Sequence, residues 1–368
     1  MQFIDLQAQQ KVLKPQIDKR IQKILAHGKY ILGPEVEELE QRLAEYIGVK
    51  HCISCANGTD ALQLALMAKN IGPGDIVFTT DFSFFATAEV IKLVGATPWF
   101  VDVDLQSYNL CPKALESAIK DCNNQHPNKA KAVISVDIFG LPANYPQIER
   151  ICREQNILLI EDAAQSFGAS LNGVKCGAFG NIACTSFFPA KPLGCYGDGG
   201  AIFTNDDDTA ETLQSLRVHG KGENKYDNIM VGMNSRLDTM QAGILLEKLQ
   251  ILDEERERRC ENAGYFNLKL AESYHTPTLQ NNIQPAYAQY TLRAKQLPRY
   301  AVLNNLKKQG IPHAIYYERP LSQQQAMRGC LKSKTSNAVQ ICQQVFSIPC
   351  HAYLSEKELG SIVEALTT

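Results

Sequence analysis

The chain has 368 residues, and its 37 Lys and Arg nearly balance its 39 Asp and Glu, for a formal net charge of −2 at pH 7. This balance indicates neither a nucleic acid nor an acidic membrane surface as a partner. The length exceeds what one compact core usually holds, so we expect a large domain followed by a smaller one. No run of about 18 apolar residues occurs, and the N-terminus becomes polar too early for a signal peptide. We therefore expect a soluble, cytoplasmic protein.

Twelve cysteines are scattered along the chain, which favours free or buried thiols over a disulfide framework. The segment His51–Cys55 contains a C-x-x-C motif, but no second motif follows at the spacing of a zinc site. We interpret the segment as a strand and expect no metal site. A metal or redox role is the alternative.

Short apolar runs alternate with amphipathic helical patterns in the first half of the chain. Helices are predicted over residues 35–46, 61–69, 86–94, 112–120 and 145–155, and strands over residues 76–78, 99–103, 132–136 and 157–160. Gly48 is a stop signal for the first of these helices. The alternation predicts an α/β domain with a largely parallel sheet covered on both faces.

The pattern changes after residue 237. One long helix is predicted over residues 237–260, and we expect the charge run 253–259 at its end to form a solvated face. A strand over 287–293 and a helix over 302–309 follow. We predict a large domain over residues 1–250 and a small α+β domain over residues 251–368, connected by the long helix.

Lys191 is the most informative residue. It lies in Ser186–Gly200, between Pro189 and Pro192, which restrict the backbone, and before several glycines, which allow close approach of a ligand. A free lysine has a pKa near 10.4, so a nucleophilic lysine requires burial, a nearby cation or an imine already formed. A surface lysine on a turn is the alternative.

An acidic segment, Glu161–Ala169, follows the predicted strand 157–160. Ligands of open α/β sheets bind beyond the carboxyl ends of the strands, so Asp162 is placed where it could hold a protonated pyridine nitrogen. Gln165 could then reach a hydroxyl on the same ring. A helix N-cap is the alternative role of Asp162.

Two segments could bind a phosphate. Gly58 and Thr59 stand at the start of the predicted helix 61–69, where backbone amides form an anion site, and Ser186 supplies a hydroxyl five residues before Lys191. Without the lysine, the N-G-T-D sequence would indicate only a capped helix. Phe84 could stack on an aromatic ring, although core packing accounts for it equally well.

These motifs resemble the DegT/StrS-type sugar aminotransferases, which are pyridoxal 5'-phosphate (PLP) enzymes of fold type I. The resemblance covers nearly the whole chain, through Gly33–Val36, Cys55–Leu62, the Glu161 and Ser186 segments and Val231–Asp238. It implies a homodimer with shared active sites. Among family members, the chain is most similar to those that aminate UDP-2-acetamido-2-deoxy-3-oxo-glucuronate.

The resemblance implies roles for individual residues. It identifies Lys191 as the catalytic lysine that forms the imine with PLP, and Asp162 as the partner of the pyridine nitrogen. The remaining implied PLP ligands are Gly58, Thr59, Phe84, Gln165, Ser186 and, from the second subunit, Asn234. Candidates for substrate contacts are Arg236, Tyr316, Tyr317 and His219.

Two of these residues depart from the family pattern, and a third has two possible roles. Tyr316 stands where similar enzymes carry a histidine, which affects the sugar contact and not the cofactor chemistry. Phe84 replaces a tyrosine of some members, so stacking is kept and a hydroxyl is lost. His219 could contact substrate or serve only its loop.

We expect transfer of the amino group of L-glutamate to C3 of a UDP-linked keto-sugar, through the pyridoxamine form of the cofactor, for diamino-sugar, O-antigen and lipopolysaccharide synthesis. An upstream sugar dehydrogenase could be needed to supply the ketone. Three alternatives remain: another nucleotide keto-sugar aminated at C3 or C4, a PLP-dependent dehydratase, which Lys191 disfavours, and a PLP-binding regulator. A regulator would require a DNA-binding element, and no basic helix-turn-helix is apparent.

Overall fold

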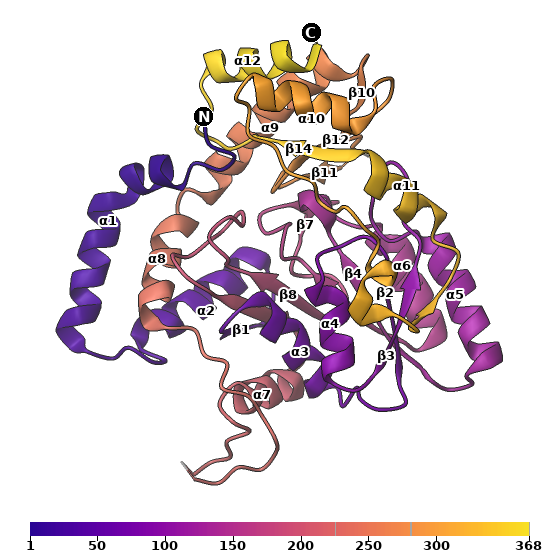
Figure 1. The fold of residues 1–368 in the computed structure, drawn as a ribbon. Helices are drawn as coiled ribbons and strands as arrows, with labels where there is room; N and C mark the ends of the chain where they lie inside the picture. Colours follow the sequence, from indigo (N-terminus) through magenta and orange to yellow (C-terminus); the bar gives the residue numbers. More distant parts are fainter. Residues whose placement is uncertain (225, 280–281, 368) are drawn as a thin grey trace.

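A central sheet organises the larger part of the chain (Figure 1). The computed structural model describes residues 1–224, 226–279 and 282–367. The sheet has eight strands in the order β1-β9-β8-β5-β4-β2-β3-β13, and only β9 runs antiparallel to its neighbours. Its strands are β1 (His51–Cys55), β2 (Ile76–Thr80), β3 (Thr97–Val101), β4 (Ala130–Val136), β5 (Leu158–Asp162), β8 (Ile182–Ser186), β9 (Gly200–Thr204) and β13 (Leu331–Lys332).

Helices cover both faces of this sheet. They are α2 (Pro34–Ile47), α3 (Gly58–Ala68), α4 (Ala86–Leu93), α5 (Pro112–Gln125), α6 (Tyr145–Gln155), α7 (Asp207–Leu216) and α8 (Thr239–Leu249). Adjacent residues of β2 show why the sheet needs two cores: Phe78 packs with α5 and α6, whereas Val77 packs with α3 and α4. Side chains of a strand alternate between its faces, so a continuous apolar strand must be covered on both. The predicted α/β architecture is confirmed.

A second, smaller core lies between residues 263 and 366. It is built from the sheet β10 (Tyr274–His275), β12 (Tyr290–Ala294) and β14 (Val345–Ile348), and from α9 (Leu252–Leu270), α10 (Arg299–Lys308) and α12 (Glu356–Thr367). Between α10 and β14 the chain returns to the large sheet, where β13 pairs with β3 and α11 (Ser336–Gln344) packs on Phe82. The division at residue 250 stays a prediction.

Several short elements complete the described chain. A small sheet joins β6 (Ser170–Leu171), β7 (Val174–Lys175) and β11 (Ile283–Gln284), and the 3-10 helices are η1 (Ile138–Gly140), η2 (Leu321–Gln323) and η3 (Gln325–Met327). The N-terminal helix α1 (Leu6–His27) extends along α8, and its Leu13 and Ile17 contact Ile244 (Figure 1).

The prediction of one helix over 237–260 is wrong. The chain forms α8 and α9, separated at Gln250 and Ile251. Each helix serves a different core, and the acidic residues at 253–255 suit the start of a new helix, where the macrodipole favours negative charge. The charge run is also not wholly solvated, because Glu255 and Arg259 are buried and lie near each other.

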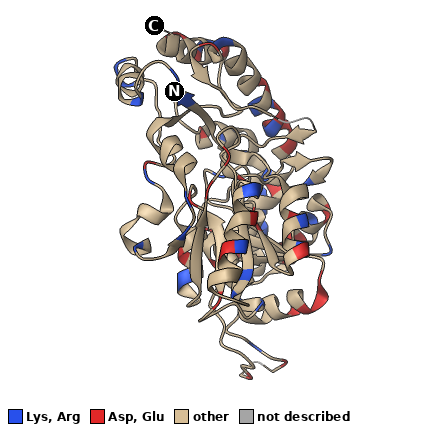
Figure 2. Ribbon diagram, turned by 90° about the vertical axis from the view of Figure 1, so that its right-hand side faces the viewer, with Lys and Arg blue, Asp and Glu red and all other residues tan. Residues whose placement is uncertain are grey.

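Cys52 and Cys55 are free thiols buried in β1, as expected for a strand. In the part of the chain that the structure describes, no helix is long and apolar enough to cross a membrane. Positions of acidic and of basic residues are interspersed along the helices in Figure 2.

Candidate active site

The singled-out residues Asp162, Ser186 and Gly58 meet at one edge of the large sheet. Asp162 is the last residue of the parallel strand β5, and Ser186 ends the neighbouring strand β8. Gly58 begins α3, which packs against β8. Lys191 follows in the loop between β8 and β9. Topology alone therefore brings together residues that are up to 133 positions apart in the sequence (58 to 191).

Asp162 is buried, with 5% of its surface exposed, and its carboxylate is oriented by two donors. The Thr87 hydroxyl donates to Oδ2 at 2.9 Å and the Ala164 amide donates to Oδ1 at 3.2 Å. The Thr87 hydroxyl is itself 3.0 Å from that of Ser83. Burial raises the pKa of Asp162, whereas Thr87, Ala164 and the Lys191 ammonium oppose this shift. A cationic ring nitrogen beside the carboxylate would lower the pKa further.

Lys191 has the properties that a nucleophilic lysine requires. Burial of its amine lowers its pKa, and Asp162 is the charged group that opposes the shift. The loop is held by a hydrogen bond from the Lys191 amide to the Phe188 carbonyl at 2.8 Å. It is so tight that a Cβ on Gly194 would overlap the Pro189 carbonyl oxygen. The sequence thus fixes the backbone around the amine.

The Gln165 side chain has a defined orientation. Its Oε1 accepts a hydrogen bond from the Phe139 amide at 2.6 Å, and its Nε2 donates to the Tyr317 hydroxyl at 3.3 Å. The Nε2 group has a second hydrogen, which is available for a ring oxygen. The Tyr317 hydroxyl, from the C-terminal region, thus contacts the Gln165 amide group, and burial raises the pKa of Tyr317.

The start of α3 forms a narrow cradle with the end of β8. Asn57 caps the helix by accepting from the Asp60 amide at 2.8 Å. A Cβ on Gly58 would lie 2.6 Å from the Ser186 Cβ, so only glycine allows this approach. The first amides of a helix have no acceptor within it, and the macrodipole favours an anion beside them. The Ser186 hydroxyl adjoins the same cradle.

Residues predicted to contact the ring face and the substrate are more exposed. Phe84 lies between β2 and α4 with 57% of its surface exposed, whereas Phe82 is in the core, so core packing does not account for Phe84. Tyr316 packs edge-to-face against Phe3 with a ring-centroid distance of 6.3 Å. Tyr317 packs similarly against Phe82. The ring of Tyr316 thus adjoins the N-terminal segment.

Asn234, the implied PLP ligand from the second subunit, and the substrate candidate Arg236 lie on one segment, and His219 bonds to this segment at Met233. Asn234 is exposed, whereas its neighbour Ser235 is buried and accepts from the Ala56 amide at 3.2 Å. Arg236 follows and is partly exposed. His219 is exposed and adopts a φ of 61°, and its backbone bonds to Met233 and Asn228. The structure therefore assigns His219 a loop contact, and its role toward substrate stays a prediction.

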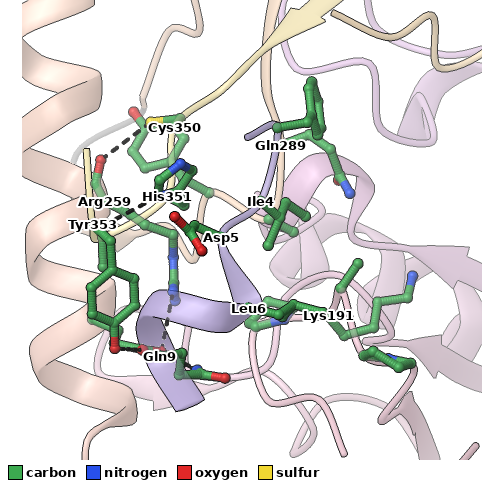
Figure 3. Close-up of a pocket in the computed structure, with 18 of the residues that line it drawn as sticks. Ile4, Asp5, Leu6, Gln9, Lys191, Arg259, Gln289, Cys350, His351 and Tyr353 are labelled. Atoms are coloured by element: carbon green, nitrogen blue, oxygen red, sulfur yellow. Dashed lines mark hydrogen bonds and ion pairs between the residues drawn. The ribbon is translucent and has the colours of Figure 1, made fainter. Parts of the chain in front are cut away.

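A cavity adjoins the loop that carries Lys191 (Figure 3). It measures about 60 Å³ and is lined by the N-terminal segment, the lysine loop and the C-terminal core. The Lys191 side chain points away from Arg259 and Tyr353 in this view. In its wall, Glu255 accepts from Gln9 at 2.9 Å and from Tyr353 at 2.5 Å. Lys191 is itself part of the wall of this cavity, and Asp162 is not.

Sequence reasoning missed Thr87 and Asp137. Thr87 lies three residues after Phe84, but a threonine inside a helix carries no signal of its own. Asp137 follows the predicted strand 132–136 directly, at the carboxyl edge of the sheet. The rule that placed Asp162 could have found Asp137 as well.

This combination of fold and site belongs to a known class of proteins. Residues 11–367 match the DegT/DnrJ/EryC1/StrS aminotransferase family, so the chain belongs to this family. The fold is fold type I of PLP-dependent transferases, which confirms the expected family and fold.

Three comparisons are the most informative. The chain is 48% identical to "UDP-2-acetamido-2-deoxy-3-oxo-D-glucuronate aminotransferase" of Pseudomonas aeruginosa, over 100% of this chain and 99% of the relative. It is 39% identical to "Pleiotropic regulatory protein" of Geobacillus stearothermophilus, over 99% and 97% of the two chains. The solved structure of S. venezuelae DesV "in complex with ketimine intermediate" is similar with a TM-score of 0.93 and 33% identity, over 99% and 96% of the two chains.

The residues of the site fit PLP. The buried carboxylate of Asp162 suits the pyridine nitrogen, and the cradle at Gly58 and Ser186 suits the phosphate. The amine of Lys191, whose pKa burial lowers, suits the aldehyde. Each part of the cofactor thus has a matching group on a rigid element.

Proposed function

We propose that the chain is a PLP-dependent aminotransferase that transfers the amino group of L-glutamate to C3 of UDP-2-acetamido-2-deoxy-3-oxo-glucuronate. The carrying observation is the pairing of Lys191 with Asp162 at the carboxyl edge of the sheet, where each shifts the pKa of the other. The full-length similarity to the P. aeruginosa enzyme supports the choice of sugar.

PLP, when bound, serves as the electron sink and as the temporary carrier of the amino group. The contribution of the chain is geometric and electrostatic. Asp162 keeps a positive charge on the ring nitrogen, which strengthens electron withdrawal from the reacting carbon. Gln165 and Phe84 would hold the ring, while Gly58, Thr59 and Ser186 would hold the phosphate.

Lys191 has two tasks. With PLP bound, its amine would hold the cofactor aldehyde and, once free, would act as the general base and acid that moves the proton of the donor carbon. The lowered pKa leaves a larger fraction of the amine neutral, which proton abstraction requires. The same amine returns the proton when the keto-sugar is aminated.

We further propose that the active unit is a homodimer with shared sites. Asn234 is exposed, and the apolar side chains of Ile229 and Val231 beside it are also exposed. A second copy that covered this segment would bury apolar surface and bring Asn234 to the partner's phosphate cradle. Arg236, two residues on, would then suit the carboxylate or the diphosphate of the substrate.

Mixed dimers test this arrangement. Lys191→Ala and Asn234→Asp each inactivate a different half of a shared site. When equal amounts of the two variants are mixed at random, half of the dimers are hybrids. One of the two sites in each hybrid is intact, so about a quarter of wild-type activity should return. If Asn234 serves its own chain, no site in any hybrid is intact and the activity stays absent.

The remaining proposals concern the cellular setting. The product class, diamino uronic sugars, fits cytoplasmic synthesis of O-antigen and other surface polysaccharides. A ketone at C3 requires prior oxidation of the C3 alcohol, so a sugar dehydrogenase would act upstream. We propose both on the similarity to the P. aeruginosa relative.

The first experiment follows the visible absorption of lysine-bound PLP. Purified protein with PLP should show this band, L-glutamate should remove it with release of 2-oxoglutarate, and Lys191→Ala should show neither change. The reverse reaction then compares two amino sugars, with 2-oxoglutarate as the amino acceptor. One is a UDP-2,3-diacetamido sugar from which the N-acetyl group at C3 has been removed, and the other is a dTDP-amino sugar with a free amine. Equal rates with a dTDP-4-amino sugar would overturn the choice of sugar, and absence of the band would overturn the enzyme class.

A regulator is the second candidate, since one 39% identical relative carries a regulatory name. Binding of PLP without response to any amino donor would favour it. A gel-shift assay on DNA from the host genome would then be the direct measurement.

A further inference from the structure

Two buried carboxyl groups adjoin the candidate cofactor site at the neighbouring strands β4 and β5. Asp137, directly after β4, and Glu161, in β5, are both fully buried. Each offers an oxygen within 4.8 Å of the other and of the Cys176 sulfur. Nothing in the proposed chemistry uses these groups.

The pair carries one proton. Two carboxylates this close in a buried site cannot both be ionised. Burial raises the pKa of both, and repulsion from Asp137 raises that of Glu161 well above its ordinary value. The other titratable neighbours, Tyr145 and Cys176, stay neutral because burial raises their pKa too. A proton held between the two carboxyl groups removes their mutual repulsion.

The oxygens of the pair are occupied by hydrogen-bond donors. Asp137 accepts from the Ser166 hydroxyl at 2.7 Å, the Tyr145 hydroxyl at 2.8 Å and the Ala143 amide at 2.9 Å. Glu161 accepts from the Gly177 amide at 2.8 Å and the Phe179 amide at 2.9 Å. Every oxygen of the pair already accepts at least one hydrogen bond, which argues against a metal site.

Asp137 contacts Asp162 directly and Gln165 only through neighbouring residues. Its amide donates to the carbonyl of Asp162 at 3.1 Å, and its carboxylate holds Ser166, the neighbour of Gln165. Two residues after Asp137, the Phe139 amide donates to the Gln165 side chain at 2.6 Å. Asp137 and the backbone that follows it thus contact the turn from 162 to 166 at three places, in addition to the bonds that Ala163 makes with Cys184 and Thr185 of β8.

We propose that Asp137 and Glu161 are positioning residues: by sharing one proton they hold the Asp162 and Gln165 side chains in the orientation that the cofactor ring requires. This inference rests on the proposed PLP site. It concerns residues that never touch the cofactor and act only through the turn.

Two isosteric variants test the proposal. Glu161→Gln keeps a donor toward Asp137 and should leave PLP affinity within about threefold of wild type. Asp137→Asn replaces one of the two carboxylate oxygens with an NH2 group, so the charge is lost and either the Ser166 hydroxyl or the Ala143 and Tyr145 donors face another donor. It should weaken PLP by about 10- to 100-fold, the range seen for outer-shell partners at metal sites. Ser135→Ala, on the same strand with a buried hydroxyl that has no partner, is the control and should match wild type.

Affinity is measured by titrating apo-protein with PLP and following the lysine-bound absorption across pH. A positioning role predicts that Asp137→Asn changes both the affinity and the pH profile of that band. A purely structural role predicts lower melting temperature with an unchanged profile, and this result would overturn the proposal. Should Asp137→Asn fail to fold, Ser166→Ala removes one donor and must reproduce the change in a milder form.

Thermal unfolding of the apo-protein gives an independent readout of the shared proton. A carboxyl whose folded pKa is raised stabilises the fold below its unfolded pKa, and this stability is lost as pH rises through the folded value. Glu161→Gln removes the titration, so its melting temperature should fall less than that of wild type between about pH 5 and pH 9. Equal losses would overturn the shared proton. Wild-type protein that shows no lysine-bound PLP would instead overturn the proposed function, and the positioning role with it.

Discussion

The cofactor side and the substrate side of the candidate site differ in how completely one chain builds them. On the cofactor side, Asp162 and Gln165 are buried, and each has defined hydrogen-bond partners on neighbouring elements. On the substrate side, His219 is exposed, and Arg236 and Tyr316 are partly exposed. The two side chains that face the cofactor ring are thus oriented within one chain, whereas the substrate candidates have exposed surface that is free to contact a ligand.

The largest expected effect is on the cofactor side. Lys191→Ala should lower glutamate-dependent turnover by more than the 10²- to 10⁴-fold typical of a lost general acid–base, because the same residue also anchors the cofactor. The rate of 2-oxoglutarate release measures it. Lys191→Arg keeps the charge and should be equally inactive, since guanidinium does not form the imine at neutral pH. Turnover within tenfold of wild type in either variant would contradict the assignment.

The next effect separates the two sides. Arg236→Ala should lower kcat/KM for the UDP-sugar by about 10- to 100-fold, the loss expected for a charge-assisted hydrogen bond of about 1.5–3 kcal/mol. The glutamate half-reaction, followed alone by cofactor absorption, should be unchanged. Arg236→Lys should recover only part of the loss, because lysine lacks the bidentate fork. An equal decrease in both half-reactions would place Arg236 on the cofactor side and erase the distinction.

A subtler change tests the electrostatics of the cofactor side. Thr87 lowers the pKa of Asp162 by hydrogen bonding, so Thr87→Val should raise it. The Asp162 carboxylate would then become protonated at a higher pH, and the ring nitrogen would lose its charged partner there. The acid limb of PLP affinity should move upward by about one pH unit, equivalent to about 1.4 kcal/mol. Thr87→Ser keeps the hydroxyl and should leave the acid limb of PLP affinity at its wild-type pH. If the serine variant shifts this limb as much as the valine variant does, packing rather than the hydrogen bond is the cause.

The same contrast explains what the sequence could predict. Short apolar strands and strand-end carboxylates follow local rules, so the parallel sheet and the position of Asp162 at the end of β5 could be anticipated. The break between α8 and α9 could not, because helical spacing continues through Gln250 and only the separate cores to which the helices belong reveal it. Thr87 was missed because its partner is 75 residues away.

The smallest effect concerns Tyr316, the departure from the family pattern. Its ring packs against Phe3 and Tyr317, whereas the Gln165 contact is made by Tyr317. Tyr316→His should therefore change the preference among UDP-sugars by only a few-fold, in the range of about 1 kcal/mol or roughly fivefold, and leave the glutamate half-reaction unaltered. The ratio of kcat/KM values for two UDP-sugars measures it, with Tyr316→Phe as the control that removes the hydroxyl alone. If the histidine variant instead loses PLP affinity, Tyr316 acts on Gln165 through its neighbour Tyr317. Tyr316 would then belong to the cofactor side of the site.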